Sequence, residues 1–212
     1  DGSNSSKAVT IDLRNATLKN EFGGGGFVST IYGELQGYTI AYNSTGKCII
    51  ENAIGSNYGD SITGNEYSNY IYGMSGDDSL YARGGSDFLF GGDGDDSLYG
   101  SYHGDVSFAI DTLEGGMGAD NFILGTTHSS FYTNSSDRFA NIKDFDFTED
   151  KLTLKNGNKY LTSLTSENNI SGLGIYIDKN SSGIVDNGDD LIAVISNKND
   201  YLSIDNINKE FV

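Results

Sequence analysis

Residues 55–99 read GSNYGDSIT GNEYSNYIY GMSGDDSLY ARGGSDFLF GGDGDDSLY, five consecutive units of nine residues. A sixth unit opens at Gly100, is interrupted by an insertion and resumes at Asp111; a seventh, GGMGADNFI, begins at Gly115. The sixth position of the units holds a carboxylate or its amide: Asp60, Asn69, Asp78, Asp87, Asp96, Asp111 and Asp120. The eighth position holds a large apolar residue: Ile62, Ile71, Leu80, Leu89, Leu98, Leu113 and Phe122. Such a fixed period indicates a repeat architecture.

The units approach the pattern G-G-x-G-x-D-x-U-x, in which U is a large aliphatic residue. Glycines permit the tight turn expected over the first six residues of each unit. The last three residues are expected to be extended, with the apolar residue pointing inward. Two units complete one turn, with a short strand on each side. The sequence therefore predicts an all-β fold, a right-handed parallel β-roll with two nonapeptide repeats per turn and flanking antiparallel β-strands.

Acidic loops would stack along the two edges of this roll, where carboxylates and main-chain carbonyls of neighbouring loops can enclose Ca²⁺. Because the core is thin, the roll is expected to fold only when several such ions bind. Shared ions are expected on one edge at Asp60 with Asp78, Asp78 with Asp96, and Asp96 with Asp120. They are expected on the other edge at Asn69 with Asp87, and at Asp87 with Asp111. Further ligands are expected within these loops at Gly73, Ser75, Gly76, Gly91, Asp93, Gly94, Gly115 and Met117.

Two of these sites stay open. The loop of Asn69 lacks inner glycines and one negative charge, which predicts a weak or empty site. The insertion after Gly100 separates Asp111 from the start of its unit. The alternative for the whole set, solvated aspartates in ordinary turns, does not explain why they recur in register.

The overall composition restricts the partners. Among 212 residues, 30 are acidic and 13 are basic, which gives a formal net charge of −17. This balance argues against nucleic acid and anionic membranes, because both require a basic face. No apolar run reaches transmembrane length. The single cysteine, Cys48, lies in an apolar run and is interpreted as a buried side chain.

The flanks of the repeats read as β-strands. Residues 8–13 alternate apolar and polar, residues 38–42 are rich in strand formers, and residues 174–177 and 191–195 suggest a strand pair. Three segments are expected: N-terminal strands over 1–54, the roll over 55–123, and a capping and secretion region over 124–212.

An acidic loop, DKNSSGIVDNGDD, joins the two strands of the expected C-terminal pair. Asp178 and Asn180 take the first and third places of an EF-hand-like loop, and Asp189 takes the twelfth. The usual glutamate is replaced and no helices flank the loop. The sequence leaves open a further calcium site or an ordinary acidic hairpin loop.

Three motifs outside the ideal repeats carry a family resemblance: IENAIG over 50–55, the stretch from Asp137 to Leu154, and the ending KEFV over 209–212. They resemble the start of the roll, the capping strands and the export signal in the C-terminal domain of serralysins, which are secreted bacterial zinc metalloproteases. The resemblance implies an extracellular module that leaves the cell through a type I secretion apparatus. It also implies an attached catalytic domain.

Catalysis is not expected from this chain itself. The zinc signature His-Glu-x-x-His is absent, and His103 and His128 have no metal-binding motif around them. The abundant carboxylates are explained by calcium binding.

A surface-binding function for polysaccharide or protein is the alternative. The ninth position of the units carries an aromatic row, Tyr72, Tyr81, Phe90 and Tyr99. The rings are expected to point outward, Tyr72 with Phe90 on one sheet and Tyr81 with Tyr99 on the other. Stacking between turns that stabilises the sheets explains the row as well.

Overall fold

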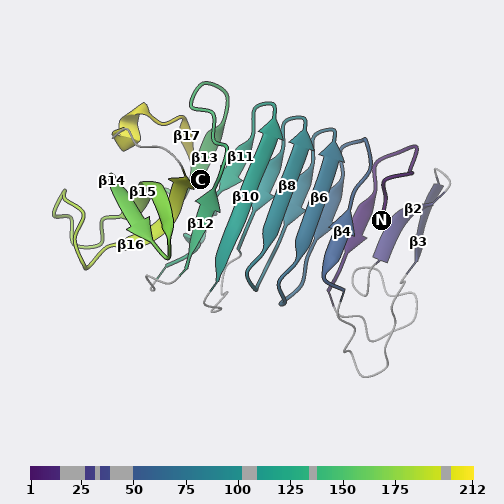
Figure 1. The fold of residues 1–212 in the computed structure, drawn as a ribbon, viewed down its shortest axis with the longest axis horizontal. Coiled ribbons are helices and arrows are strands. Elements are labelled where there is room, and N and C mark those ends of the chain that lie inside the picture. The colour runs from purple at the N-terminus through teal and green to yellow at the C-terminus, as the bar shows by residue number, and fades with distance from the viewer. Residues whose placement is uncertain (15–26, 32–33, 39–49, 102–108, 134–137, 197–201) are drawn as a thin grey trace.

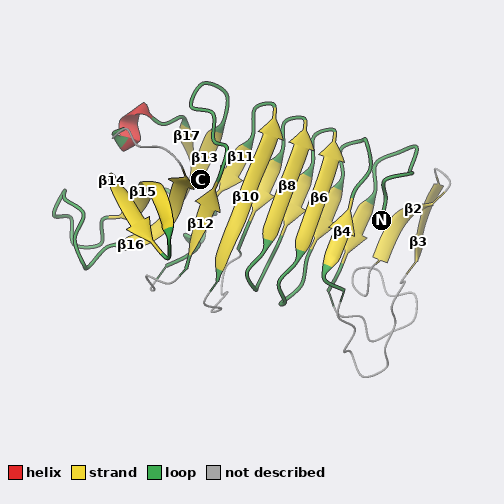
Figure 2. Cartoon of the chain, viewed as in Figure 1, coloured by secondary structure: helices red, strands yellow, loops and turns green. Residues whose placement is uncertain are grey.

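The computed structural model describes residues 1–14, 27–31, 34–38, 50–101, 109–133, 138–196 and 202–212, with only the backbone described for 27–31 and 34–38. This part of the chain is strand and turn, apart from one short 3₁₀ helix, η1 (Ile204–Asn206). The strands follow one another along the long axis of the molecule, from the purple N-terminal end to the green and yellow C-terminal end (Figure 1). Figure 2 shows the connecting loops gathered along two opposite edges.

Two sheets form the molecule. The nine-stranded sheet contains β1 (Thr10–Asp12), β2 (Phe27–Ile31), β3 (Glu34–Tyr38), β5 (Ser61–Thr63), β7 (Ser79–Tyr81), β9 (Ser97–Tyr99), β11 (Asn121–Ile123), β13 (Lys151–Leu154) and β17 (Lys209–Phe211). The eight-stranded sheet contains β4 (Asn52–Ile54), β6 (Tyr70–Ser75), β8 (Phe88–Asp93), β10 (Ile110–Met117), β12 (Phe139–Ile142), β14 (Tyr160–Glu167), β15 (Ile170–Ile177) and β16 (Asp190–Ser196). Successive strands of the repeats alternate between the sheets and pair in parallel with the strand one turn away. The predicted parallel β-roll is confirmed.

The eighth residues of the repeats stack into the core between the sheets. Ile62 lies beside Leu80, and Leu80 beside Leu98, in the nine-stranded sheet. Ile71, Leu89 and Leu113 form the matching column in the other sheet. All seven residues predicted at this position are fully buried. The alternation of the short strands therefore directs one apolar side chain per unit into a continuous core.

The strands of the eight-stranded sheet are longer than expected. β6, β8 and β10 continue into the first residues of the following loops, where Met74 pairs with Gly92, and Gly92 with Gly116. Gly92 has φ of 121°, and a Cβ there would collide with the carbonyl oxygen of Met74. These loops therefore stack closely enough to extend the ladder, and only glycine fits at this step.

The parallel ladders run beyond the repeats at both ends. β1 pairs in parallel with β5 and antiparallel with β2, so the expected strand over 8–13 adds one more turn to the roll. In the eight-stranded sheet, β12 pairs in parallel with β10 and then with β16. In the nine-stranded sheet, β13 pairs in parallel with β11 and then with β17. The ladders cross both limits of the segment 55–123, and the division into three segments stays a prediction.

The C-terminal strand pair is also present. β15 and β16 pair antiparallel, and β14 adds an antiparallel edge to β15. Of the expected strand over 38–42, Tyr38 ends β3 and the remaining positions lie outside the described residues, as do Cys48 and His103. In the described part of the chain, no helix has the length and apolar character needed to span a membrane.

Candidate metal sites

Carboxylates stack in a row on the edge formed by loops 55–60, 73–78, 91–96 and 115–120, here called edge 1. Each backbone N–H donates to the carboxylate one turn further along. The N–H of Asp60 donates to Asp78 Oδ1 (2.6 Å), and the N–H of Asp78 donates to Asp96 Oδ1 (2.8 Å). The N–H of Asp96 donates to Asp120 Oδ1 (3.0 Å). All four carboxylates are buried. The structure thus brings together the three pairs expected on this edge, and the shared N–H fixes the orientation of each carboxylate.

The second row lies on the edge formed by loops 64–69 and 82–87 and by the described residues 100–101 and 109–111, here called edge 2. The N–H of Asn69 donates to Asp87 Oδ1 (2.6 Å), and that of Asp87 to Asp111 Oδ1 (2.9 Å). The insertion after Gly100 therefore leaves Asp111 in register. Asp111 differs in one respect, because its Oδ2 accepts a hydrogen bond from the hydroxyl of Tyr132 (2.7 Å).

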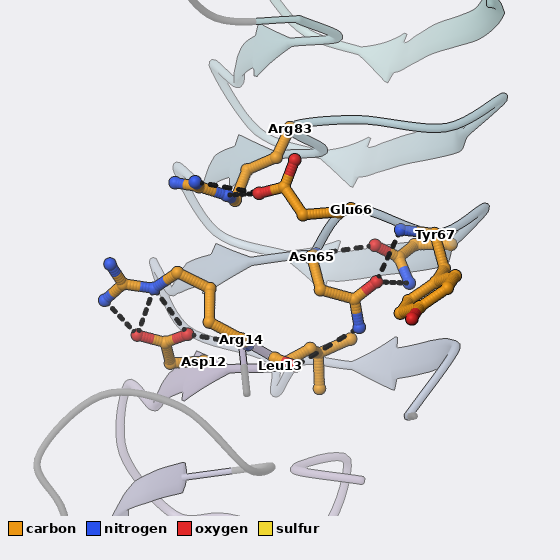
Figure 3. Close-up of polar contacts among 8 residues, drawn as sticks. Asp12, Leu13, Arg14, Asn65, Glu66, Tyr67 and Arg83 are labelled. Carbon is orange, nitrogen blue, oxygen red and sulfur yellow. Dashed lines mark hydrogen bonds and ion pairs between the residues drawn. The ribbon is translucent and has the colours of Figure 1, made fainter. Parts of the chain in front are cut away.

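The amide of Asn69 suits the start of edge 2. Its Nδ2 donates to the carbonyl oxygen of Glu51 (3.2 Å) and to Asn65 Oδ1 (3.4 Å). Asn65 in turn donates from its side chain to the carbonyl of Leu13 (3.1 Å), a contact drawn in Figure 3. Asn69 Oδ1 still accepts the backbone N–H of Asn65 (2.8 Å), while the other side of its side chain faces acceptor oxygens. An amide, which can both accept and donate, therefore suits this position better than a carboxylate.

Two carboxylate oxygens in the middle of edge 1 lack a donor. Asp78 Oδ2 and Asp96 Oδ2 are buried without a hydrogen-bond partner in the described part of the chain. A Cβ added at Gly73 would meet Asp78 Oδ2 and the carbonyl oxygen of Gly91 together. A Cβ at Gly91 would meet Asp96 Oδ2 and the carbonyl oxygen of the next glycine, Gly115. Oxygens of two loops thus converge beside each glycine, and such an all-oxygen arrangement fits a hard cation such as Ca²⁺.

Burial is the main reason why these carboxylates resist ionisation without a cation. Burial raises the pKa of Asp78 to about 8, with a further increase from Asp96 and Asp60. The same cause raises the pKa of Asp96 to about 7 and that of Asp120 to about 6. A bound cation would stabilise the charged forms instead, so metal binding and proton release are coupled here.

The remaining expected ligands of edge 1 lie in the same stacked loops. Ser75 pairs with Asp93, and Asp93 with Met117, along the extended ladder. Gly76 and Gly94 have φ of 100° and 137°, as the tight turns require. No cluster of three His, Cys, Asp or Glu side chains that could hold a metal occurs among the described residues. The carboxylate and main-chain oxygens of the stacked loops are hard ligands, which suit calcium better than zinc.

The acidic loop between β15 and β16 is held by its own hydrogen bonds. Asp178 accepts from the N–H groups of Ser182 (3.0 Å) and Gly183 (3.1 Å), and Asp189 Oδ1 accepts from the N–H of Lys179 (3.2 Å). The side chain of Asn180 donates to Asp186 Oδ2. Gly183, sixth in the loop, has φ of 75°, as the sharp turn of an EF-hand-like loop requires.

The sequence interpretation missed the next carboxylate of edge 1. Asp150 accepts the N–H of Asp120 at Oδ1 (2.9 Å) and that of Asp146 at Oδ2 (2.8 Å). Asp144 accepts the N–H groups of Gly115 and Gly116. The tetrapeptide that begins at Asp150 keeps the last four positions of the repeat, D-x-U-x, and could have indicated this rung.

An outer row of carboxylates was also missed. The N–H of Asp95 donates to Asp77 Oδ1 (3.0 Å), and that of Ala119 to Asp95 Oδ1 (2.9 Å). Both carboxylates hold the fifth position of their units, next to the buried row. The doubled aspartates of GMSGDD and GGDGDD were the available signal.

The outward aromatic residues pair as expected. Tyr81 stacks on Tyr99 with ring centroids 4.4 Å apart, and Tyr72 lies 6.0 Å from Phe90 in a tilted arrangement. A further stacked pair, Tyr70 with Phe88, was not expected. His128 is exposed, and its ring Nδ1 lies 2.9 Å from the hydroxyl oxygen of the neighbouring Thr127.

Comparisons with known proteins agree with the repeats. Residues 54–89 and 81–106 match the family model of the RTX calcium-binding nonapeptide repeat. No curated protein matches the sequence at a significant level. Among the solved structures that match is the AlgE6R3 subunit from the Azotobacter vinelandii mannuronan C5-epimerase, 22% identical, with 68% of this chain and 74% of that chain covered and a TM-score of 0.26. Both the identity and the TM-score are low, and the parallel β-roll is established by the strand pairing of this chain itself. The chain carries RTX calcium-binding nonapeptide repeats, folded as a parallel β-roll.

Proposed function

We propose that this chain is a calcium-induced folding and secretion module of a larger extracellular protein. The observation that carries the proposal is the pair of buried carboxylate oxygens, Asp78 Oδ2 and Asp96 Oδ2, which lie beside carbonyl oxygens and without donors. A buried charge is strongly unfavourable unless an opposite charge compensates it. Calcium shared between stacked loops supplies that charge at the expected sites of both edges.

The same arrangement makes folding depend on the surroundings. Without cations, the buried carboxylates must either take up protons or stay charged without compensation. Both destabilise the metal-free roll relative to the ionised unfolded chain near neutral pH. Extracellular calcium sites commonly bind with affinities of about 10⁻⁴ to 10⁻³ M. The chain would therefore stay unfolded where free calcium is scarce and fold where calcium is abundant, because binding free energy becomes folding free energy.

A calcium titration followed by far-UV circular dichroism tests this proposal. The metal-free chain should lack most of its β-structure and gain it cooperatively as calcium rises through the millimolar range. Magnesium is the control, since it demands stricter octahedral geometry and should not replace calcium at equal concentration. Full cooperative structure in excess chelator would refute the proposal.

The secretion context rests on the resemblance to serralysins. In this proposal the chain is the non-catalytic C-terminal part of a secreted zinc metalloprotease and leaves through a type I apparatus that recognises residues 209–212. Lys209–Phe211 form β17, which pairs with β13 in the folded roll. A signal in this place would be accessible before folding and docked afterwards. Export from cells that carry such an apparatus should be lost when residues 209–212 are deleted, and unchanged export would exclude this role.

We also propose a calcium ion at the loop of residues 178–189, with Asp178, Asn180 and Asp189 among its ligands. The support is the EF-hand-like spacing together with the positive φ of Gly183. Asp189→Asn should lower the number of calcium ions counted by native mass spectrometry by one and leave the folding of the roll unchanged. An unaltered count would favour a hairpin loop held by hydrogen bonds alone.

Binding of an acidic polysaccharide is a second candidate function, favoured by one groove. Tyr81 and Tyr99 line a groove of about 400 Å³ together with Arg14 and Arg83, two of the three arginines in the sequence. Figure 3 shows Arg14 paired with Asp12, and Arg83 with Glu66. The ion pair with Glu66 is exposed and therefore weak, so a sugar carboxylate could replace it while the tyrosine rings stack on the sugar.

Titration with alginate, followed by tyrosine fluorescence in saturating calcium, tests the groove. A saturable change that is lost in Tyr99→Ala and absent with neutral dextran would support binding. No response to alginate would leave the aromatic pairs with a role in stabilising the sheet.

A further inference from the structure

The last carboxylate of edge 2 has a different environment from the carboxylates in the middle of edge 1. On edge 1, Asp78 Oδ2 and Asp96 Oδ2 are buried without a hydrogen-bond partner in the described part of the chain. At the last loop of edge 2, Asp111 Oδ2 accepts a hydrogen bond of 2.7 Å from the hydroxyl of Tyr132. Asp111 is 1% exposed and Tyr132 is 5% exposed, so water is excluded from this bond. A donor from outside the repeats thus satisfies the Oδ2 atom of the last carboxylate.

The hydroxyl stands where the roll elsewhere presents a carbonyl oxygen. A Cβ added at Gly73, the first residue of its loop, would meet the carboxylate of that loop and the carbonyl oxygen of Gly91 from the next turn. A Cβ added at Gly100, the equivalent residue of the last loop of edge 2, would meet Tyr132 Oη and the carboxylate of its own loop. Tyr132 therefore replaces the contribution of a further turn.

This replacement changes the chemistry of the position. A carbonyl oxygen only accepts hydrogen bonds, so a carboxylate that faces it requires a cation between them. A phenol hydroxyl can donate its proton to the carboxylate directly. Tyr132 has φ of 55°, a left-handed conformation that is uncommon for a bulky residue and indicates that the surrounding structure holds it in place.

The pairing of β12, the next strand of this sheet, also indicates that the carboxylate row of edge 2 ends at Asp111. β12 pairs in parallel with β10 and places Ala140 opposite Asp111. The sixth position of the following turn thus holds a methyl group, and no carboxylate continues the row there. Edge 1, by contrast, continues to Asp150, 30 residues beyond Asp120.

We propose that Tyr132 is the end stop of the calcium row on edge 2. Its hydroxyl takes the place of a cation on the outer side of Asp111, so the row ends on a hydrogen bond and edge 2 holds fewer ions than edge 1. The proposal rests on calcium binding by the repeats, and it adds that Tyr132 limits the number of ions bound along edge 2. The flanking region thereby sets the number of ions as well as covering the core.

Tyr132→Phe is the direct test, because it removes the hydroxyl and keeps the ring. Asp111 then requires a cation, and native mass spectrometry of the full chain in saturating calcium should count one ion more than in the wild type. Tyr160→Phe is the matched control. Tyr160 is also buried, and its hydroxyl donates to the carbonyl of Lys155 (2.9 Å), so its loss should leave the count unchanged.

Each outcome decides between the alternatives. An equal count in Tyr132→Phe and the wild type would overturn the end stop while leaving calcium binding intact. Failure of Tyr132→Phe to fold in saturating calcium, with Tyr160→Phe folded, would also overturn it, because calcium should replace the missing proton donor. No bound calcium in the wild type would instead refute the proposed function.

Discussion

Replacing Asp96 by asparagine should make the roll less dependent on calcium and also more stable without it. In the wild type, Asp96 Oδ1 accepts the N–H of Asp78 (2.8 Å), and Oδ2 is buried without a donor. Asparagine can keep the first contact and present its NH₂ group toward the carbonyl oxygen of Gly115, which lies on the same side. Asn69 already uses its amide in this way at the start of edge 2.

The expected gain in stability of the metal-free chain follows from the loss of Asp96 Oδ2, a buried oxygen without a donor. A buried polar group without a partner costs about 1–3 kcal/mol, and a charged one costs more. Asp96→Asn should therefore raise the ratio of folded to unfolded metal-free chain by at least about 5- to 150-fold. In saturating calcium the variant should bind one ion fewer, since the charge that holds the ion is gone.

The assay uses excess chelator, with trimethylamine oxide added to favour the compact state, and follows far-UV circular dichroism. Asp96→Asn should reach half folding at a lower osmolyte concentration than the wild type. Asp205→Asn is the control, because it removes the same charge from a side chain that is 89% exposed. A higher osmolyte requirement for Asp96→Asn, or an unchanged calcium count, would show that Asp96 does not hold an ion.

Three further predictions concern acidity, the glycines and the core. Because the pKa of Asp78 (about 8) and that of Asp96 (about 7) are raised above the ordinary 3.8, the folded metal-free chain binds more protons than the unfolded chain between about pH 4 and pH 8. Structure measured by circular dichroism in chelator should therefore increase as the pH falls through this range, and saturating calcium should remove the dependence. Gly91→Ala should raise the calcium midpoint of folding by about tenfold or more, since the new Cβ would collide with Asp96 Oδ2 and the carbonyl of Gly115; an unchanged midpoint would contradict the site. Leu89→Ala should lower the free energy of unfolding in saturating calcium by about 2–5 kcal/mol, measured with urea, because the packed strands on both sides cannot close the cavity. Leu164→Ala, at a half-exposed position of β14, should cost far less.

The repeats made the centre of the molecule predictable. Carboxylates at a fixed position of a nine-residue unit must stack once two units form a turn, so the contact of Asp78 with Asp96 follows from the period alone. The buried column of Ile71, Leu89 and Leu113 follows for the same reason. Periodicity fixes which side chains share an edge or a face, and the structure agrees at each described position.

The flanks could not be predicted in the same way. Asp150 continues edge 1 after a gap of 30 residues without a glycine loop before it, so a search for repeats passes over it. The contact of Tyr132 with Asp111 joins an irregular loop to the roll, and no spacing encodes it. β1 joins the parallel ladder across about 50 residues, although its short sequence suits either direction of pairing. These contacts depend on tertiary packing, which local patterns do not report.

The alternation of successive units between the two sheets restricts how a protein of this type can change in length. Equivalent residues in the regular turns lie 18 positions apart, as Asp60 and Asp78 do. Loss or gain of a single unit would move every later unit to the opposite sheet, exchange the two edges and present the wrong face to the C-terminal cap. Removal of a whole turn would preserve every later register. In evolution and in engineering, such rolls should therefore shorten or grow in pairs of units, while irregular insertions are confined to the loops.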